Sequence, residues 1–194
     1  MKPVFLFLVQ LVLCCSISLA QEAITFTDSR DGKQYQAIEF DIPLEGGVSV
    51  KRTWMAQNLD FETEGSFCYK NEPAYCGKFG KLYTYDVAVE VCPEGWRVPT
   101  KNDWYMLFSA FGGEKVAGEA MKEDGESGMN LFAGGFGDAS GTFKGIGVEG
   151  NYWDSEEISG NTAGVITVRK SSPGIFHSKI GKTHRNSSRC IKDY

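Results

Sequence analysis

The chain has 194 residues, with 20 basic and 25 acidic side chains and a formal net charge of −5. No run or patch of lysine and arginine occurs, which argues against nucleic acid and anionic membrane surfaces as partners. The length is typical of one domain with a core of its own.

The first twenty residues have the three parts of an export signal. Lys2 supplies the positive start, and residues 5–13 are mostly apolar. Ser18 and Ala20 place small side chains at the −3 and −1 positions of a cleavage site. The apolar run is too short to cross a bilayer. We therefore expect a signal peptide over residues 1–20 that is removed after Ala20.

A lipid anchor on Cys14 or Cys15 is the alternative to complete removal of the signal. Lipidation favours a small residue before the cysteine, whereas Leu13 precedes Cys14. We therefore expect a secreted protein, or one displayed at the cell surface, rather than a lipoprotein.

The mature chain is expected to form one disulfide-stabilised domain over residues 21–194. Residues 21–60 would form an N-terminal hairpin region and residues 61–194 the main body. No further apolar segment approaches the length of a membrane span, so we expect none in the mature chain.

Four cysteines follow the signal: Cys68, Cys76, Cys92 and Cys190. Export and an even count predict two disulfides, for which three pairings are possible. We favour Cys68–Cys76, because residues 71–73 between them are turn-like, together with Cys92–Cys190. No cysteine pair has C-x₂-C spacing, so a zinc site is disfavoured, and we expect no metal or cofactor.

Short strands are expected in the N-terminal part of the chain. Residues 24–27 and 34–40 flank a turn cluster that ends at Gly32, a pattern typical of a hairpin. Two further short strands are expected at residues 48–50 and 53–55.

Two helices are expected in the middle of the chain, after a loop over residues 61–83. The first would cover residues 84–92, and the second begins at Thr100, where the spacing to Asp103 resembles a capping box. A weaker helical pattern covers residues 114–122. Apolar residues recur at helical spacing in the second helix: Trp104, Leu107, Phe108 and Phe111.

Glycines punctuate the rest of the chain, with strands expected at residues 152–155, 164–168, 174–177 and 188–191. The whole pattern predicts an α+β fold. Two short helices would pack on small twisted antiparallel sheets, with long Gly-rich loops.

Short sequence pieces occur in a recognisable order over about residues 24–194. They are residues 53–59, Cys68-Tyr69, residues 83–86, Cys92-Pro93-Glu94-Gly95-Trp96-Arg97-Val98-Pro99-Thr100, Asp103-Trp104, residues 134–136, residues 152–156 and Ser188-Arg189-Cys190-Ile191-Lys192-Asp193. The ordered set resembles the Fibrobacter succinogenes major paralogous domain family. The resemblance implies an exported or surface-attached bacterial protein, and a fold similar to the formylglycine-generating-enzyme and C-type-lectin-like folds. It also implies that Cys92 and Cys190 are a structural pair.

Aromatic residues are the first candidates for a binding surface. Trp54, Trp96, Trp104 and Trp153 could form a platform for sugar rings, but the capping signals and strand alternation around them favour the core. Tyrosines are better surface candidates because they carry a polar tip: Tyr69, Tyr75, Tyr83 and Tyr105.

Acidic residues and histidines give weaker signals. Asp154, Glu156 and Glu157 could bind calcium with nearby carbonyl groups, although adjacent glutamates on a strand face opposite sides, and we favour an exposed surface. His177 and His184 are the only histidines. Neither belongs to a recognisable catalytic motif, so we expect no catalytic residues.

The expected function is therefore binding without catalysis, with a polysaccharide or a cell-envelope protein as the partner. The loops between Gly112 and Gly150 are the expected variable surface. The alternative is a structural or interaction module of the cell envelope. An enzyme like the formylglycine-generating enzymes is less favoured, because pairing of Cys92 with Cys190 leaves no obvious redox thiol.

Overall fold

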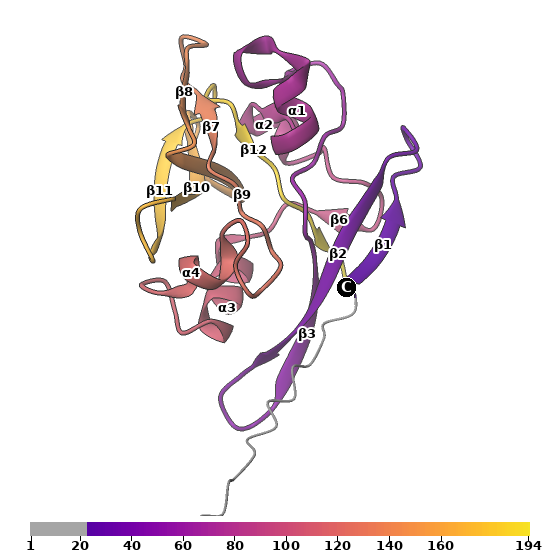
Figure 1. Cartoon of the computed structure of the whole chain (residues 1–194), viewed down its shortest axis with the longest axis vertical. Helices are drawn as coiled ribbons and strands as arrows, with labels where there is room; N and C mark the ends of the chain where they lie inside the picture. Colours follow the sequence, from indigo (N-terminus) through magenta and orange to yellow (C-terminus); the bar gives the residue numbers. More distant parts are fainter. Residues whose placement is uncertain (1–22) are drawn as a thin grey trace, which may run out of the picture.

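The structure, a computed structural model, describes residues 23–194, and the expected signal peptide lies outside the described residues. The described part is a mixed α+β fold with two antiparallel-rich sheets and four short α-helices (Figure 1). No helix in residues 23–194 has the length and apolar character needed to span a membrane.

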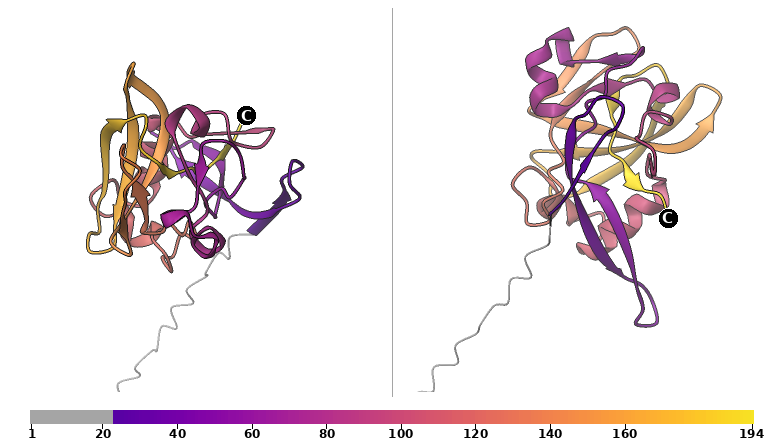
Figure 2. Two further views of the ribbon diagram at one scale, coloured as in Figure 1. Left: turned by 90° about the horizontal axis from the view of Figure 1, so that it is seen from above. Right: turned by 90° about the vertical axis from the view of Figure 1, so that its right-hand side faces the viewer.

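The first sheet joins both ends of the described chain. Its strands, in spatial order, are β1 (Ala23–Thr27), β2 (Gln34–Pro43), β3 (Ser49–Met55), β13 (Ile191–Lys192) and β6 (Trp96–Arg97). All neighbours are antiparallel. Gly32 has a φ of 75° in the expected turn between β1 and β2. The β2–β3 hairpin projects beyond the rest of the molecule, as the side view in Figure 2 shows.

The second sheet contains the longer C-terminal strands. Its order is β11 (Ile175–Gly181), β10 (Thr162–Arg169), β9 (Glu149–Ser159), β12 (Asn186–Ser187), β5 (Leu82–Tyr83) and β4 (Ser66–Phe67). A further hairpin of β7 (Gly134–Gly137) and β8 (Phe143–Ile146) joins the sheet through a parallel pairing of β7 with β9. Residues 163–168 of β10 are all buried, as expected for a strand covered on both faces.

The prediction of two helices is too low, because the described chain has four: α1 (Pro73–Phe79), α2 (Tyr85–Ala88), α3 (Lys101–Ala110) and α4 (Ala117–Met121). A 3₁₀ turn, η1 (Tyr69–Asn71), precedes α1. Helix α1 lies in the segment expected to be loop. The helix has only seven residues and contains Gly77, so its sequence shows no clear apolar stripe. The disulfide at Cys76 holds it in place. Helix α2 is only four residues long, and the chain beyond it turns more tightly, with the N–H groups of Glu90 and Val91 donating to carbonyls three residues earlier.

Helix α3 begins with the expected capping box. The Thr100 Oγ1 atom accepts a 3.1 Å hydrogen bond from the Asp103 backbone N–H, and Asp103 Oδ2 accepts one of 2.8 Å from the Thr100 N–H. Arg97 Nη1 donates to the same carboxylate oxygen at 2.7 Å. Burial of Asp103 opposes its ionisation, but the hydrogen bonds from Arg97 and Thr100 outweigh burial and lower the pKa of this carboxyl.

This capping box makes a prediction about acid stability. The pKa of Asp103 is lower in the folded state than in the unfolded chain, so its ionised carboxylate stabilises the folded state. This stabilisation is fully present above the unfolded-state pKa of about 3.9 and is lost as the pH falls through the folded-state pKa. We expect the stability difference between the wild type and Asp103→Asn to be largest near neutral pH and to shrink between about pH 5 and pH 2. Urea unfolding of both proteins at several pH values measures it, and a difference independent of pH would contradict the assignment.

Three of the four tryptophans form the core, as expected. Trp54, Trp104 and Trp153 are completely buried. The rings of Trp54 and Trp104 lie 4.6 Å apart between the first sheet and α3, and Trp153 Nε1 donates to the Tyr83 carbonyl at 2.8 Å. Trp96 is partly buried and stacks on Phe26. These rings therefore offer no continuous exposed platform.

Both favoured disulfides are present. Cys68–Cys76 closes a sequence separation of 8 residues, and Cys92–Cys190 closes one of 98. Cys190 is completely buried next to β13, so the second disulfide ties the segment between α2 and β6 to the C-terminal strand.

Candidate functional site

A groove rich in carboxamide side chains opens between the start of β2, α1 and the loop before β7. Its volume is about 330 Å³, and its lining includes five amides: Gln34, Gln36, Gln57, Asn58 and Asn130. We call it the amide groove. Gln34 and Gln36 alternate along β2 and therefore lie on one face of that strand. Gln57 follows β3, and its Oε1 atom accepts a 2.9 Å hydrogen bond from the Gln36 backbone N–H.

The three glutamines of the groove are available to a ligand. Gln34, Gln36 and Gln57 are all exposed. Within residues 23–194, no protein group hydrogen-bonds the side-chain amides of Gln34 and Gln36 or the Nε2 atom of Gln57. A carboxamide both donates and accepts hydrogen bonds, so this rim can match a ligand with hydroxyl or amide groups.

The floor of the groove rests on Arg189, which is completely buried. One guanidinium nitrogen donates to the carbonyls of Met55, at 2.9 Å, and Met129, at 2.6 Å. The other donates to Asn58 Oδ1 at 2.6 Å and to the Asn130 carbonyl at 3.1 Å. Burial lowers the pKa of Arg189 to about 10. The guanidinium thus joins β3, the loop after it and the loop before β7 at one point.

Both asparagines of the groove are fixed by the protein. Asn58 Nδ2 donates to the Phe79 carbonyl at 2.7 Å and to Ser187 Oγ at 3.3 Å, while its oxygen is held by Arg189. Asn130 adopts a φ of 49°, and its side chain bonds backbone groups of its own loop. These two residues shape the floor, and the glutamines provide the contacts that remain available.

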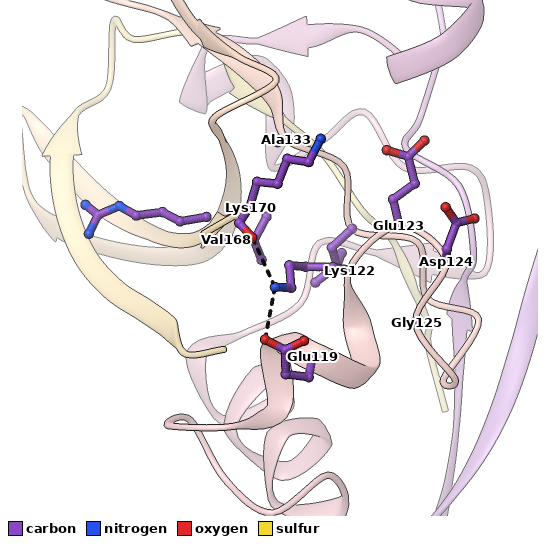
Figure 3. A pocket seen from close by; sticks show the side chains of 10 residues that line it. Glu119, Lys122, Glu123, Asp124, Gly125, Ala133, Val168 and Lys170 are labelled. Carbon is purple, nitrogen blue, oxygen red and sulfur yellow. Dashed lines mark hydrogen bonds and ion pairs between the residues drawn. The ribbon is translucent and has the colours of Figure 1, made fainter. Parts of the chain in front are cut away.

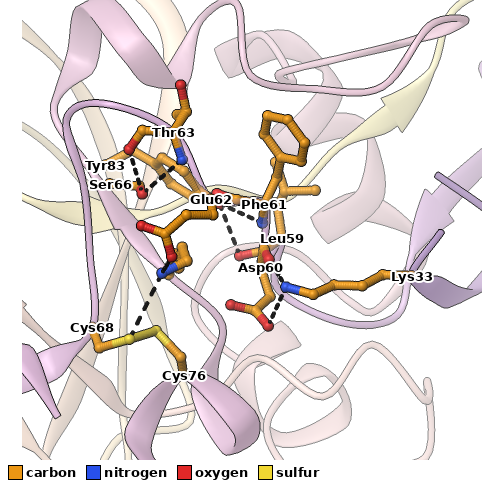
Figure 4. The surroundings of a disulfide bond; sticks show 11 residues. Lys33, Leu59, Asp60, Phe61, Glu62, Thr63, Ser66, Cys68, Cys76 and Tyr83 are labelled. Atoms are coloured by element: carbon orange, nitrogen blue, oxygen red, sulfur yellow. Dashed lines mark hydrogen bonds and ion pairs between the residues drawn. A yellow bond between two sulfur atoms is a disulfide. The ribbon is translucent and has the colours of Figure 1, made fainter. Parts of the chain in front are cut away.

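One wall of the groove contains an unpaired acceptor. Lys33 Nζ forms an ion pair of 2.8 Å with Asp60 Oδ2 and also donates to the Asp60 carbonyl (Figure 4). The other carboxylate oxygen, Oδ1, is buried and accepts no hydrogen bond from any described residue. The hydroxyl oxygen of Tyr35 accepts from the Asp60 N–H at 3.1 Å, and burial raises the pKa of Tyr35 to about 12. This oxygen has no exposed surface, so its missing hydrogen bond is a cost inside the protein and not a contact open to a ligand.

A second cavity of about 380 Å³ lies on the predicted loop surface between Gly112 and Gly150 (Figure 3). Its charged groups are largely engaged by the protein itself. Lys122 Nζ donates to the Ser172 carbonyl at 3.0 Å and pairs with Glu119 at 3.4 Å. No aromatic residue is in its lining, whereas Tyr35 and Phe132 line the amide groove.

Asp154 is completely buried, so the expectation that it lies on an exposed surface is wrong. Its Oδ2 atom lies 2.8 Å from His177 Nε2 on β11, and its Oδ1 accepts from the Glu156 N–H at 2.8 Å. The intervening strand β10 offers Gly164, where an added Cβ would lie 2.3 Å from the carboxylate. The side chain of Asp154 is buried because this glycine leaves space for it, which local sequence patterns do not reveal.

The surroundings of this pair lack the features of a metal site. Glu156 and Glu157 are exposed, and Glu157 pairs with Lys182 at 2.8 Å. Among residues 23–194, no group of three or more histidine, cysteine or acidic residues is placed to hold a metal ion. His177 is mostly buried against Tyr105, and His184 is half-buried with its Nδ1 atom 3.0 Å from the Gly181 carbonyl.

The expectation that four tyrosines lie at the surface is only partly correct. Tyr75 and Tyr105 are partly exposed, but Tyr69 and Tyr83 are buried. The Tyr83 hydroxyl group donates to the Phe61 carbonyl at 2.9 Å, which satisfies it inside the fold.

The glutamines of the groove are not among the binding residues expected from the sequence. Gln34 and Gln36 do occupy alternate positions of an expected strand, and this spacing indicates that their side chains share one face.

This architecture defines a disulfide-closed α+β domain with a polar groove and a buried arginine beneath it. The chain belongs to the Fibrobacter succinogenes major domain family, whose model matches residues 48–192. No curated protein and no solved structure matched the chain significantly. The family match includes the floor residues Asn58, Asn130 and Arg189, whereas Gln34 and Gln36 precede it.

Proposed function

We propose that the protein is an exported, non-catalytic binding domain that holds a segment of polysaccharide in the amide groove. The observation that carries this proposal is the set of exposed side-chain amide groups without protein partners along one groove: those of Gln34 and Gln36 and the Nε2 atom of Gln57. Sugar hydroxyl groups donate and accept hydrogen bonds, so they complement carboxamides, which do the same.

The size and rigidity of the groove support a short polymer segment as the ligand. A volume of about 330 Å³ lies at the lower end of the range for small-molecule sites. Phe132 and Tyr35 contribute apolar surface to the lining. The disulfide at Cys76 and the hydrogen bonds of Arg189 fix the surrounding loops, which reduces the entropy lost on binding.

We also propose that the fold is C-type-lectin-like and that the protein acts outside the cytoplasm, secreted or at the cell surface. The presence of β1 and β13 in one sheet and the long-range Cys92–Cys190 disulfide support the fold. Two disulfides in one domain support an oxidising compartment.

The binding proposal is tested by retention of the purified protein on a panel of insoluble plant and bacterial polysaccharides. We expect retention on at least one of them, and about tenfold weaker binding by the double variant Gln36→Ala/Gln57→Ala, since each lost hydrogen bond costs about 0.5–1.5 kcal/mol. Asn161→Ala removes an exposed amide in the β9–β10 turn and is the matched control, with unchanged binding expected.

Two results would contradict the proposal. Retention that is equal for the wild type and the double variant would place the sugar elsewhere on the surface. Absence of retention on every polysaccharide, together with co-fractionation in an envelope complex, would instead favour a structural or interaction module.

A further inference from the structure

A buried lysine lies beside the smaller disulfide. The side chain of Lys81 is only 7% exposed, and its Nζ atom lies 3.8 Å from Cys68 Sγ. The same ammonium group forms an ion pair of 2.5 Å with Glu62, whose own side chain is 76% exposed. Figure 4 shows Glu62 above the disulfide that joins Cys68 and Cys76.

The two sulfur atoms of this disulfide have different surroundings. Cys68 is partly exposed and has the ammonium group of Lys81 beside it, whereas Cys76 is only 7% exposed and belongs to the lining of the amide groove. In the other disulfide Cys190 is completely buried and Cys92 is partly exposed, and no described lysine or arginine side chain hydrogen-bonds a sulfur atom of that pair. Among the described residues, the two disulfides thus differ in that Cys68–Cys76 has an ammonium group beside one of its sulfur atoms and Cys92–Cys190 has none.

We propose that Cys68–Cys76 is an exchangeable disulfide and that Cys76 is the site at which a low-molecular-weight thiol is added. The thiolate of the reagent attacks Cys76 Sγ, a new sulfur–sulfur bond forms there, and the Cys68–Cys76 bond breaks. The electron pair goes to Cys68, which leaves as a thiolate next to Lys81. A second thiolate can attack the reagent sulfur of the adduct, releasing reduced Cys76 and the oxidised disulfide of the reagent.

The position of Lys81 explains why the exchange has this direction. A thiol leaves faster when its pKa is lower, and a nearby lysine lowers the pKa of a thiol. Lys81 is held in place by its burial, so its charge acts on Cys68 at short range. The hydrogen bond from Lys81 also lowers the pKa of Glu62 and keeps that carboxylate charged. The carboxylate therefore competes with the Cys68 thiolate for the ammonium group of Lys81. Neutralising Glu62 should therefore favour departure of Cys68 further.

The test uses the oxidised mature protein with 2-mercaptoethanol under native conditions. Samples are acid-quenched at intervals, alkylated and mapped by mass spectrometry. We expect the Cys68–Cys76 disulfide to open at least about tenfold faster than Cys92–Cys190, with the first adduct on Cys76. Lys81→Met should slow opening by about tenfold, whereas Glu62→Gln should accelerate it.

Each of three results would overturn the proposal: equal rates for the two disulfides, a first adduct on Cys68, or an unchanged rate in Lys81→Met. If Lys81→Met fails to fold, Glu62→Gln decides on its own, because the change is at an exposed side chain. A slower or unchanged rate in Glu62→Gln would then contradict the role of the ammonium group. The readout is thiol exchange and is independent of whether the groove binds a polysaccharide.

Discussion

Replacement of Arg189 by methionine is expected to destabilise the domain by about 4 kcal/mol or more. The guanidinium group is completely buried and supplies hydrogen bonds to three backbone carbonyls and to Asn58 Oδ1. Methionine fills much of the volume but donates no hydrogen bond, so these acceptors would stay buried and unpaired. Each unpaired acceptor costs about 1–3 kcal/mol, and the costs of neighbouring acceptors do not simply add. A loss of this size approaches the total stability of many domains.

Urea unfolding followed by tryptophan fluorescence measures this effect. Arg169→Met is the matched control, because Arg169 is 49% exposed and pairs with Glu149 at 3.2 Å. An exposed ion pair of this kind contributes about 0–1 kcal/mol. Arg189→Lys should lie between the two, since an ammonium group has three donors in place of five. Stability of Arg189→Met within 1 kcal/mol of the wild type would show that the guanidinium does not hold the groove floor.

Loss of the long-range disulfide is expected to cost more than loss of the short one. With sequence separations of 98 and 8 residues, the chain-entropy model gives about 4.7 kcal/mol for Cys92–Cys190 and about 2.5 kcal/mol for Cys68–Cys76. Cys190→Ser places its hydroxyl group at a completely buried position and Cys76→Ser at one that is 7% exposed, so the expected difference rests mainly on the lengths of the closed loops.

The comparison is made between Cys190→Ser and Cys76→Ser, with the remaining disulfide intact in each. The unpaired partner cysteine is blocked by alkylation in both variants, which keeps thiol exchange out of the measurement. We expect Cys190→Ser to be less stable by about 2 kcal/mol. Equal stabilities, or the reverse order, would mean that constraint of the unfolded chain is not the main contribution of these disulfides.

The elements that were predicted well from the sequence are determined by residues close to one another along the chain. The capping box at Thr100 marks the start of α3 within one turn, and Gly32 supplies the positive φ of the β1–β2 turn. Helix α1 has no comparable signal, because it is short and depends on the disulfide at Cys76. Strand β7 consists largely of glycine and is defined by its pairing with β9, so it has little side-chain pattern of its own.

The candidate site was harder to predict because its parts are distant in sequence. Arg189 meets Asn58 across 131 residues and the Asn130 carbonyl across 59. Periodicity and capping rules concern neighbours along the chain, so they cannot place a buried guanidinium on such partners. The Asp154–His177 pair is similar, because it exists only where β10 presents Gly164 between two other strands.

Binding in the amide groove is tested most directly by an NMR titration of the mature, ¹⁵N-labelled protein with an oligosaccharide cut from a retained polysaccharide. The side-chain NH₂ resonances of Gln34, Gln36 and Gln57 report on the rim of the amide groove, and those of Asn102 and Asn161 report on other surfaces. If the ligand binds in this groove, we expect saturable shifts at the three glutamines and none at the two asparagines. Saturable shifts confined to the asparagines, or to the cavity around Lys122, would contradict binding in the amide groove.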